Sequence, residues 1–174
     1  MTQIPIFDEV EKQLGLDTNL ILSLQKEDDW SFIIKCHSLI EAVINHSLSR
    51  HINNQDFDRH LRSLNLNGRS GRVELSSNLN ILKPELKKFV EAFSEIRNEF
   101  VHSIESINSS ISSYFDGLNN DQKNHFLNRI SFVCNLSNPI NLGFESPLLA
   151  FKEKPREVIF YGLSALITVL VVSK

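Results

Sequence analysis

Residues 84–104 read PELKKFVEAFSEIRNEFVHSI, and this stretch indicates how the chain folds. Pro84 suits the first position of a helix, and Glu85 places an acid in the first turn, where it complements the helix dipole. Apolar residues then recur at the three- and four-residue spacing of a helix with one buried stripe: Leu86, Phe89, Val90, Phe93, Ile96, Phe100, Val101 and Ile104. The stretch therefore predicts a long amphipathic helix.

Three polar residues stand near the end of this helix: Arg97, Asn98 and His102. On a helical wheel Arg97 falls on or beside the apolar stripe, whereas Asn98 and His102 share a neighbouring edge, about 40° apart. An unpaired buried guanidinium costs several kcal/mol, so we expect Arg97 either to pair with an acid or to point into a hydrated cleft. Histidine exchanges a proton near neutral pH and arginine binds phosphate through its planar fork, a combination that suits metal-free phosphodiester chemistry.

A second long helix is predicted upstream, from about Trp30 to Ile52, with its acids and cap supplied by residues 27–29. Its apolar positions are too regular and too many for a strand. His37 and Glu41 lie four residues apart beside this apolar stripe. They are interpreted either as a satisfied core histidine with an edge carboxylate, or as a supporting pair in which Glu41 orients Arg97.

The two helices together resemble a known group of helical domains. The string Arg97-Asn98-x-x-x-His102, its context FVEAFSEIRNEFVHS and the upstream FIIKCHSLIEAVINHSLSRHI resemble the HEPN superfamily, and within it the mannitol operon repressor-like family. The resemblance covers roughly residues 28–135. It implies an all-α fold and two possible functions, because the superfamily contains toxin and defence ribonucleases as well as non-catalytic relatives.

If the ribonuclease resemblance holds, it implies catalytic roles for all three motif residues. His102 would act as general base or acid toward the ribose 2′-hydroxyl, Arg97 would stabilise charge on the phosphate, and Asn98 would hold substrate or orient His102. The partners implied are RNA, a second copy that completes a composite site, and a cognate antitoxin protein. The alternative is a regulator or adaptor in which the same residues form a structural network; nothing in the chain resembles a helix-turn-helix reader of DNA.

The segment from residue 50 to residue 72 is locally basic within an acidic chain. Arg62, Arg69 and Arg72 are its candidate RNA contacts, and Gly68-Arg69-Ser70-Gly71-Arg72 is flexible enough for backbone amides to approach a phosphate. The string matches neither a P-loop nor a dinucleotide fingerprint, and a Gly-Arg loop is also common as a solvated connector. Both interpretations stay open.

Composition restricts how the chain can bind nucleic acid, metals and cofactors. The formal charge of −3 excludes coating of nucleic acid by bulk electrostatics, so any RNA contact must be local. Cys36 and Cys134 fit no metal or redox spacing and are expected to be buried free thiols in a reducing cytoplasm. The first residues lack the pattern of a signal peptide, no metal-binding motif is present, and no cofactor is expected.

The rest of the chain is predicted to complete a single all-α domain over residues 1–174, a bundle with two long central helices. Short helices are expected between Ile4 and Leu16, from a cap at Asp17 and Thr18 to Leu24, and from Val73 to Leu82. After His102 the apolar pattern degrades through a serine-rich stretch, which indicates a fraying helix or a kinked continuation. A further helix is expected from Gln122 to Leu136, with His125 exposed near its start.

Residues 137–174 are predicted to form an irregular strap, or one short turn, followed by a hydrophobic C-terminal helix. The apolar run from Val158 to Val172 would reach about 22 Å as a helix, short of the ~30 Å hydrocarbon core, so a buried helix or an oligomer contact is favoured over a membrane anchor. Lys152, Lys154 and Arg156 keep a membrane anchor possible, and β-branched residues near its end keep a strand possible.

Overall fold

The computed structural model describes residues 5–102, 109–135 and 146–172, and every regular element in these ranges is a helix. The prediction of an all-α fold is confirmed. The helices are α1 (Pro5–Leu14), α2 (Leu20–Ser23), η1 (Leu24–Lys26), α3 (Asp29–Ile52), α4 (Gln55–Ser63), α5 (Arg72–Asn78), α6 (Pro84–His102), α7 (Ile111–Gly117), α8 (Asn120–Ile130), α9 (Phe132–Asn135), α10 (Pro147–Glu153), α11 (Pro155–Ile167) and the π-helical turn η3 (Thr168–Val172).

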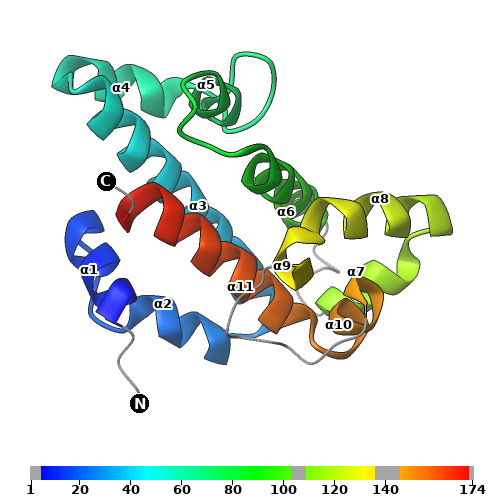
Figure 1. The fold of residues 1–174 in the computed structure, drawn as a ribbon. Coiled ribbons are helices and arrows are strands. Elements are labelled where there is room, and N and C mark those ends of the chain that lie inside the picture. The colour runs from blue at the N-terminus through cyan, green and yellow to red at the C-terminus, as the bar shows by residue number, and fades with distance from the viewer. Residues whose placement is uncertain (1–4, 103–108, 136–145, 173–174) are drawn as a thin grey trace.

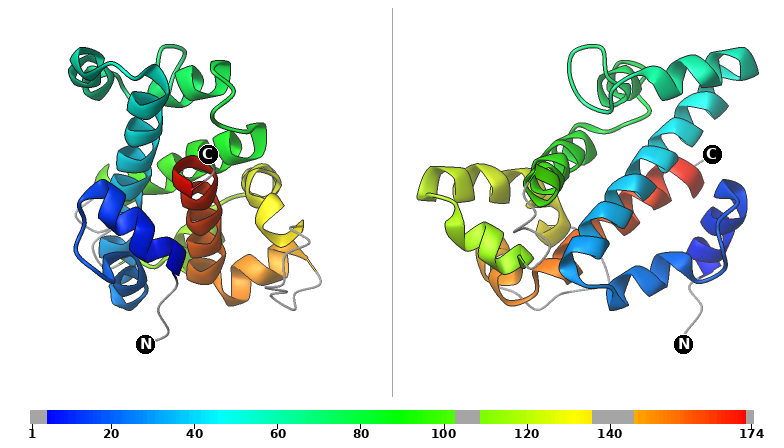
Figure 2. Two further views of the ribbon diagram at one scale, coloured as in Figure 1. Left: turned by 60° about the vertical axis from the view of Figure 1, so that its left-hand side comes forward. Right: turned by 180° about the vertical axis from the view of Figure 1, so that it is seen from behind.

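Helices α3, α6 and α11 form the centre of the molecule (Figure 1). Helix α11 runs beside α3, and α6 packs against both. The short helices α1 and α2 lie along one side of this centre, α4 and α5 lie at one end, and α7, α8 and α10 gather near the other end (Figure 2). One cluster of buried side chains connects all of these layers.

Several helix starts match the signals in the sequence. The Asp28 side chain caps α3 by accepting from the Ser31 amide, as predicted, and Asn119 and Gln122 form a reciprocal capping box at the start of α8. Gly15 ends α1 with a positive φ of 66°, which glycine adopts without steric cost. These local contacts fix where the elements begin and end.

Asp29 at the start of α3 joins three parts of the chain. Its carboxylate accepts from the Ile111 amide of α7 at 2.8 Å and from Arg156 Nη1 of α11 at 2.6 Å. Beside it, Trp30 Nε1 donates to the Phe100 carbonyl of α6 at 2.9 Å. Helices that are distant in sequence are thereby fastened around one end of α3.

Helices α6 and α11 pack closely together at Gly162. A Cβ atom at this position would lie 2.3 Å from the Phe89 ring, so only glycine lets α11 rest directly on that ring. Phe89 is itself 1% exposed. This contact sets the position of the first half of α6.

The apolar segment near the C-terminus is helical and not a strand, and its buried side chains belong to the core cluster. Pro155–Val172 is, within the described ranges, the one helical stretch long and apolar enough to cross a membrane, and half of it is buried inside the fold. Arg156 is fixed by Asp29 and by the Leu24 and Gln25 carbonyls, and its guanidinium lies 4.5 Å from the centre of the Phe32 ring. One of the three basic residues before the apolar run is therefore used inside the protein.

Four details of the sequence prediction are corrected by the structure. Part of the basic segment forms helix α4, and the serine-rich stretch contains α7, which Ser110 caps by accepting from the Ser113 amide. The predicted helix from Gln122 is interrupted at Ser131, and the predicted strap contains the regular helix α10. The residues directly after His102, 103–108, and residues 136–145 of the strap lie outside the described ranges.

The start of α2 depends on a buried carboxylate rather than on the predicted cap at Asp17 and Thr18. Glu11 is 2% exposed, and its two oxygens accept from the amides of Asn19 at 2.7 Å and Ile21 at 2.8 Å. We expect Glu11→Ala to lower the free energy of unfolding by about 2–3 kcal/mol, because one buried and one partly buried amide lose a charged acceptor.

Urea unfolding measures this change. The matched control is Glu9→Ala on the same helix, where the side chain is exposed and an effect within about 0.5 kcal/mol is expected. Equal effects of the two substitutions would show that Glu11 does not hold α2.

Candidate functional site

The predicted motif lies at the C-terminal end of α6 and is open to solvent. Arg97 is half-buried, and its Nη1 donates to Asn98 Oδ1 at 3.2 Å. Asn98 and His102 are exposed. No carboxylate of the described residues forms an ion pair with Arg97, so the expected pairing with an acid is not found among them.

The three motif residues do not share one face of α6. Asn98 and His102 are four residues apart and lie on one edge of α6, about 40° from each other. Arg97 and His102 are five residues apart, which places them roughly 140° apart around the helix and about 7.5 Å apart along it. Arg97 contacts Asn98, whereas His102 makes no hydrogen bond to any described residue.

His37 and Glu41, the supporting pair proposed from the sequence, have different roles in the structure. Glu41 does not orient Arg97: its carboxylate accepts from Arg72 Nη2 at 3.1 Å, so this interpretation is wrong. His37 is the satisfied core histidine of the other interpretation. It is 7% exposed, its ring stacks on Phe93 with 6.4 Å between centroids, and its Nε2 lies 3.4 Å from Ser94 Oγ.

His37 makes the stability of this region depend on pH. Burial lowers its pKa below the ordinary 6.5, Glu41 opposes this shift, and Arg97 and Arg72 add to it. The unfolded chain therefore binds a proton first as pH falls through about 6.5, and the folded state loses stability below that pH. We expect His37→Gln to reduce the slope of unfolding free energy between pH 7 and pH 5, by up to about 1.4 kcal/mol per pH unit.

Urea unfolding at a series of pH values measures the slope. His46, whose pKa is also lowered by burial and by Arg50, should retain part of the slope in the His37→Gln variant. The exposed His60 provides the control, since His60→Gln should keep the slope of the wild type. If His37→Gln leaves the slope unchanged, His37 is not the source of the pH dependence.

The three predicted RNA contacts of the basic segment have different environments. Arg72 is 8% exposed and paired with Glu41, so its assignment to RNA is corrected: it is a structural residue of the interface between α3 and α5. Arg62 is exposed but paired with Asp58, with 2.9 Å between Nε and Oδ2. Arg69 is exposed and forms no ion pair with the described residues. Of these three arginines, only Arg69 is both exposed and without an ion-pair partner among the described residues.

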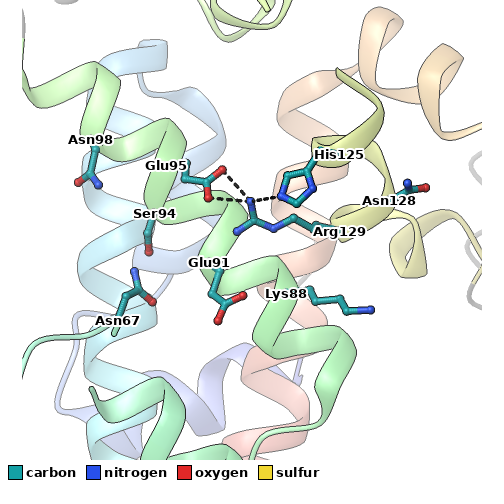
Figure 3. A pocket seen from close by; sticks show the side chains of 9 residues that line it. All are labelled: Asn67, Lys88, Glu91, Ser94, Glu95, Asn98, His125, Asn128 and Arg129. Atoms are coloured by element: carbon teal, nitrogen blue, oxygen red, sulfur yellow. Dashed lines mark hydrogen bonds and ion pairs between the residues drawn. The ribbon is translucent and has the colours of Figure 1, made fainter. Parts of the chain in front are cut away.

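A hollow of about 770 Å³ lies between α6 and α8, beside the motif (Figure 3). We call it the α6/α8 hollow. Asn98 is the one motif residue that lines it; the others are Asn67, Lys88, Glu91, Ser94, Glu95, His125, Asn128 and Arg129. The hollow therefore extends from the motif along α6 toward its N-terminal half.

An ion pair holds the wall of this hollow in place. Arg129 Nη1 donates to both carboxylate oxygens of Glu95, each at 2.7 Å, and lies 3.4 Å from His125 Nε2 (Figure 3). The Arg129 side chain is 10% exposed, whereas that of Glu95 is 57% exposed. Arg129 Nε and Nη2 make no hydrogen bond to a described residue, so the other edge of the guanidinium is unused.

Sequence reasoning did not find this second group of residues. His125 and Arg129 stand four residues apart on α8 and therefore share a face of the helix. This spacing could have been recognised in the sequence. Their partner Glu95 is 34 residues from Arg129 in the chain, and only the packing of α8 on α6 brings the two together.

Comparison with known proteins returned no matching family model, no matching curated protein and no matching solved structure. The described residues also contain no group of three or more His, Cys, Asp or Glu side chains placed to hold a metal ion.

Proposed function

We propose that this protein is a metal-independent endoribonuclease of the HEPN type, related in character to toxin and defence ribonucleases. The observation that carries the proposal is the state of Arg97: a half-buried guanidinium without a carboxylate partner among the described residues, on the same helix end as the exposed Asn98 and His102. A guanidinium in that state is available to a phosphate.

In the proposed reaction the ribose 2′-oxygen attacks the adjacent phosphorus and the bond from phosphorus to the 5′-oxygen breaks. The products are a 2′,3′-cyclic phosphate and a 5′-hydroxyl. His102 takes the proton of the 2′-hydroxyl, and the leaving 5′-oxygen takes up one proton from solvent. Arg97 stabilises the negative charge that develops on the phosphate, and Asn98 holds Arg97 and the substrate.

The proposed catalytic unit is a homodimer. Because Arg97 and His102 occupy positions about 140° apart around α6, we place Arg97 of one copy beside His102 of the other, in two copies related by a two-fold axis. Val101, which is 44% exposed and about 40° from Arg97 around α6, supplies apolar surface for this contact. A cognate antitoxin protein and a cytoplasmic location belong to the same proposal.

The test is incubation of the purified protein with total RNA in the presence of a chelator. Cleavage that leaves 2′,3′-cyclic phosphate ends is expected, and an oligonucleotide lacking 2′-hydroxyls should stay intact. Absence of cleavage by a folded dimer would overturn the proposal.

A second candidate is a non-catalytic regulator or adaptor of the mannitol operon repressor-like type. It is favoured by one observation: Arg97 and His102 do not line the α6/α8 hollow, and the Arg97 guanidinium is hydrogen-bonded to Asn98 of its own helix. In this case Arg97→Lys and His102→Ala would alter dimerisation or partner binding, and RNA would stay intact with the wild type as well.

A further inference from the structure

The α6/α8 hollow contains unused hydrogen-bonding groups of both kinds. Arg129 Nε and Nη2 and Lys88 Nζ are donors that no described residue engages. The Glu91 carboxylate makes no hydrogen bond or ion pair within the described ranges, and Asn67 Oδ1 is buried without a donor. A buried acceptor left unpaired costs about 1–3 kcal/mol, so the hollow favours a ligand that brings N–H groups.

The charges that line the hollow are balanced. Lys88 and Arg129 oppose Glu91 and Glu95, and the remaining lining side chains are amides, one serine and one histidine. A phosphate would meet two carboxylates here, and a cation would meet two basic groups. The arrangement fits a neutral group whose edge carries donors and acceptors side by side.

The position of the hollow connects it to the motif. Asn98 lines the hollow and also accepts from Arg97 Nη1, so a ligand in the hollow lies one side chain away from the proposed phosphate site. A volume of about 770 Å³ is in the range of small-molecule sites and exceeds what a purine ring requires. The pairing of Arg129 with Glu95 holds the guanidinium in one orientation before any ligand arrives.

We infer that the α6/α8 hollow binds an unpaired base of single-stranded RNA, with guanine preferred. The N1–H and N2–H₂ groups of guanine would donate to the Glu91 carboxylate, and its O6 would accept from Arg129 or Lys88. The His125 ring offers a face for stacking, as aromatic and histidine side chains do in single-strand recognition. The inference rests on the proposed function only in naming RNA as the source of the base.

The experiment measures binding without cleavage. The probes are four labelled 2′-O-methyl oligonucleotides, which lack the attacking hydroxyl. One is an all-A strand, and the other three carry a single central G, C or U in place of A. Fluorescence anisotropy gives the Kd of each strand. We expect the wild type to bind the G strand about ten-fold more tightly than the all-A strand, since a good bidentate base contact discriminates by about 5- to 150-fold. Glu91→Gln should abolish this preference, because the amide presents one acceptor instead of two.

Two further variants separate the causes. Glu85→Gln changes an exposed acid on the same helix that does not line the hollow, and it should keep the preference for G. His102→Ala should also keep it. Circular dichroism and urea unfolding confirm that Glu91→Gln is folded. Equal Kd values for all four strands, or a preference for G that survives Glu91→Gln, would overturn the inference.

The outcome is distinguishable from that of the proposed function. Preference for G together with intact RNA in the chelator assay would overturn the nuclease and leave the hollow as a base-binding site. Cleavage of RNA with no preference among the four strands would overturn the base site and leave the nuclease in place.

Discussion

Replacement of His102 by alanine is expected to lower the rate of RNA cleavage by about 10²–10⁴ while leaving the protein folded. His102 is exposed and makes no hydrogen bond to the described part of the chain, so its removal should cost no stability. The measurement is single-turnover cleavage of a labelled RNA in chelator. His51→Ala, which changes an exposed histidine at the end of α3, is the matched control and should retain full activity.

The proposed composite site adds a sharper form of this test. Arg97→Lys keeps the charge but loses the planar fork, so it should be nearly as inactive as His102→Ala. When the two variants are mixed and exchanged, mixed dimers regain one intact pair of Arg97 and His102. About a quarter of the wild-type activity should then return if each site uses one residue from each copy. A mixture that stays inactive would place both residues in the same copy or remove one of them from the site.

The second large effect is expected on stability. Phe93→Ala should lower the free energy of unfolding by about 3–5 kcal/mol, because the ring is 1% exposed and its removal leaves a cavity between α3 and α6. The Phe93 ring lies 6.0 Å from that of Phe89 and 6.4 Å from that of His37, centroid to centroid. Chemical denaturation monitored by circular dichroism measures the loss.

Phe57→Ala is the control for this substitution. Phe57 belongs to α4 and is 37% exposed, so its replacement should change the unfolding free energy by no more than about 0.5 kcal/mol. A similar loss for both phenylalanines would show that Phe93 does not hold α6 against α3.

The long helices were predictable because each has a strong local signal. Helices α3 and α6 carry regular apolar stripes, with a capping aspartate at Asp28 and a proline at the first turn of α6. The structure places both ends of α3 and the start of α6 within a residue of the prediction. Helix α4 was missed because its residues are almost all polar and only Phe57 and Leu61 mark an apolar face. Tertiary contacts, rather than the period of the sequence, stabilise such a helix.

The sequence predicted only those contacts of the candidate site that join residues close together in the chain. Arg97 and Asn98 are neighbours in the chain, and their contact follows from α6 alone. The burial of Arg72 could not be foreseen, because its partner Glu41 is 31 residues away on α3. The ion pair between Arg129 and Glu95 could not be predicted either. The sequence gives the positions of the charged residues but does not show which of them come into contact after the helices have packed.

The contact between Gly162 and Phe89 has a consequence for how this protein is made. Helix α11 fills the centre of the fold but leaves the ribosome after every helix that it covers, so the nascent chain carries exposed apolar faces on α3 and α6 until then. Chaperones bind such faces during synthesis. Helix α6 can therefore reach its final packed position only after residues 155–167 have been synthesised.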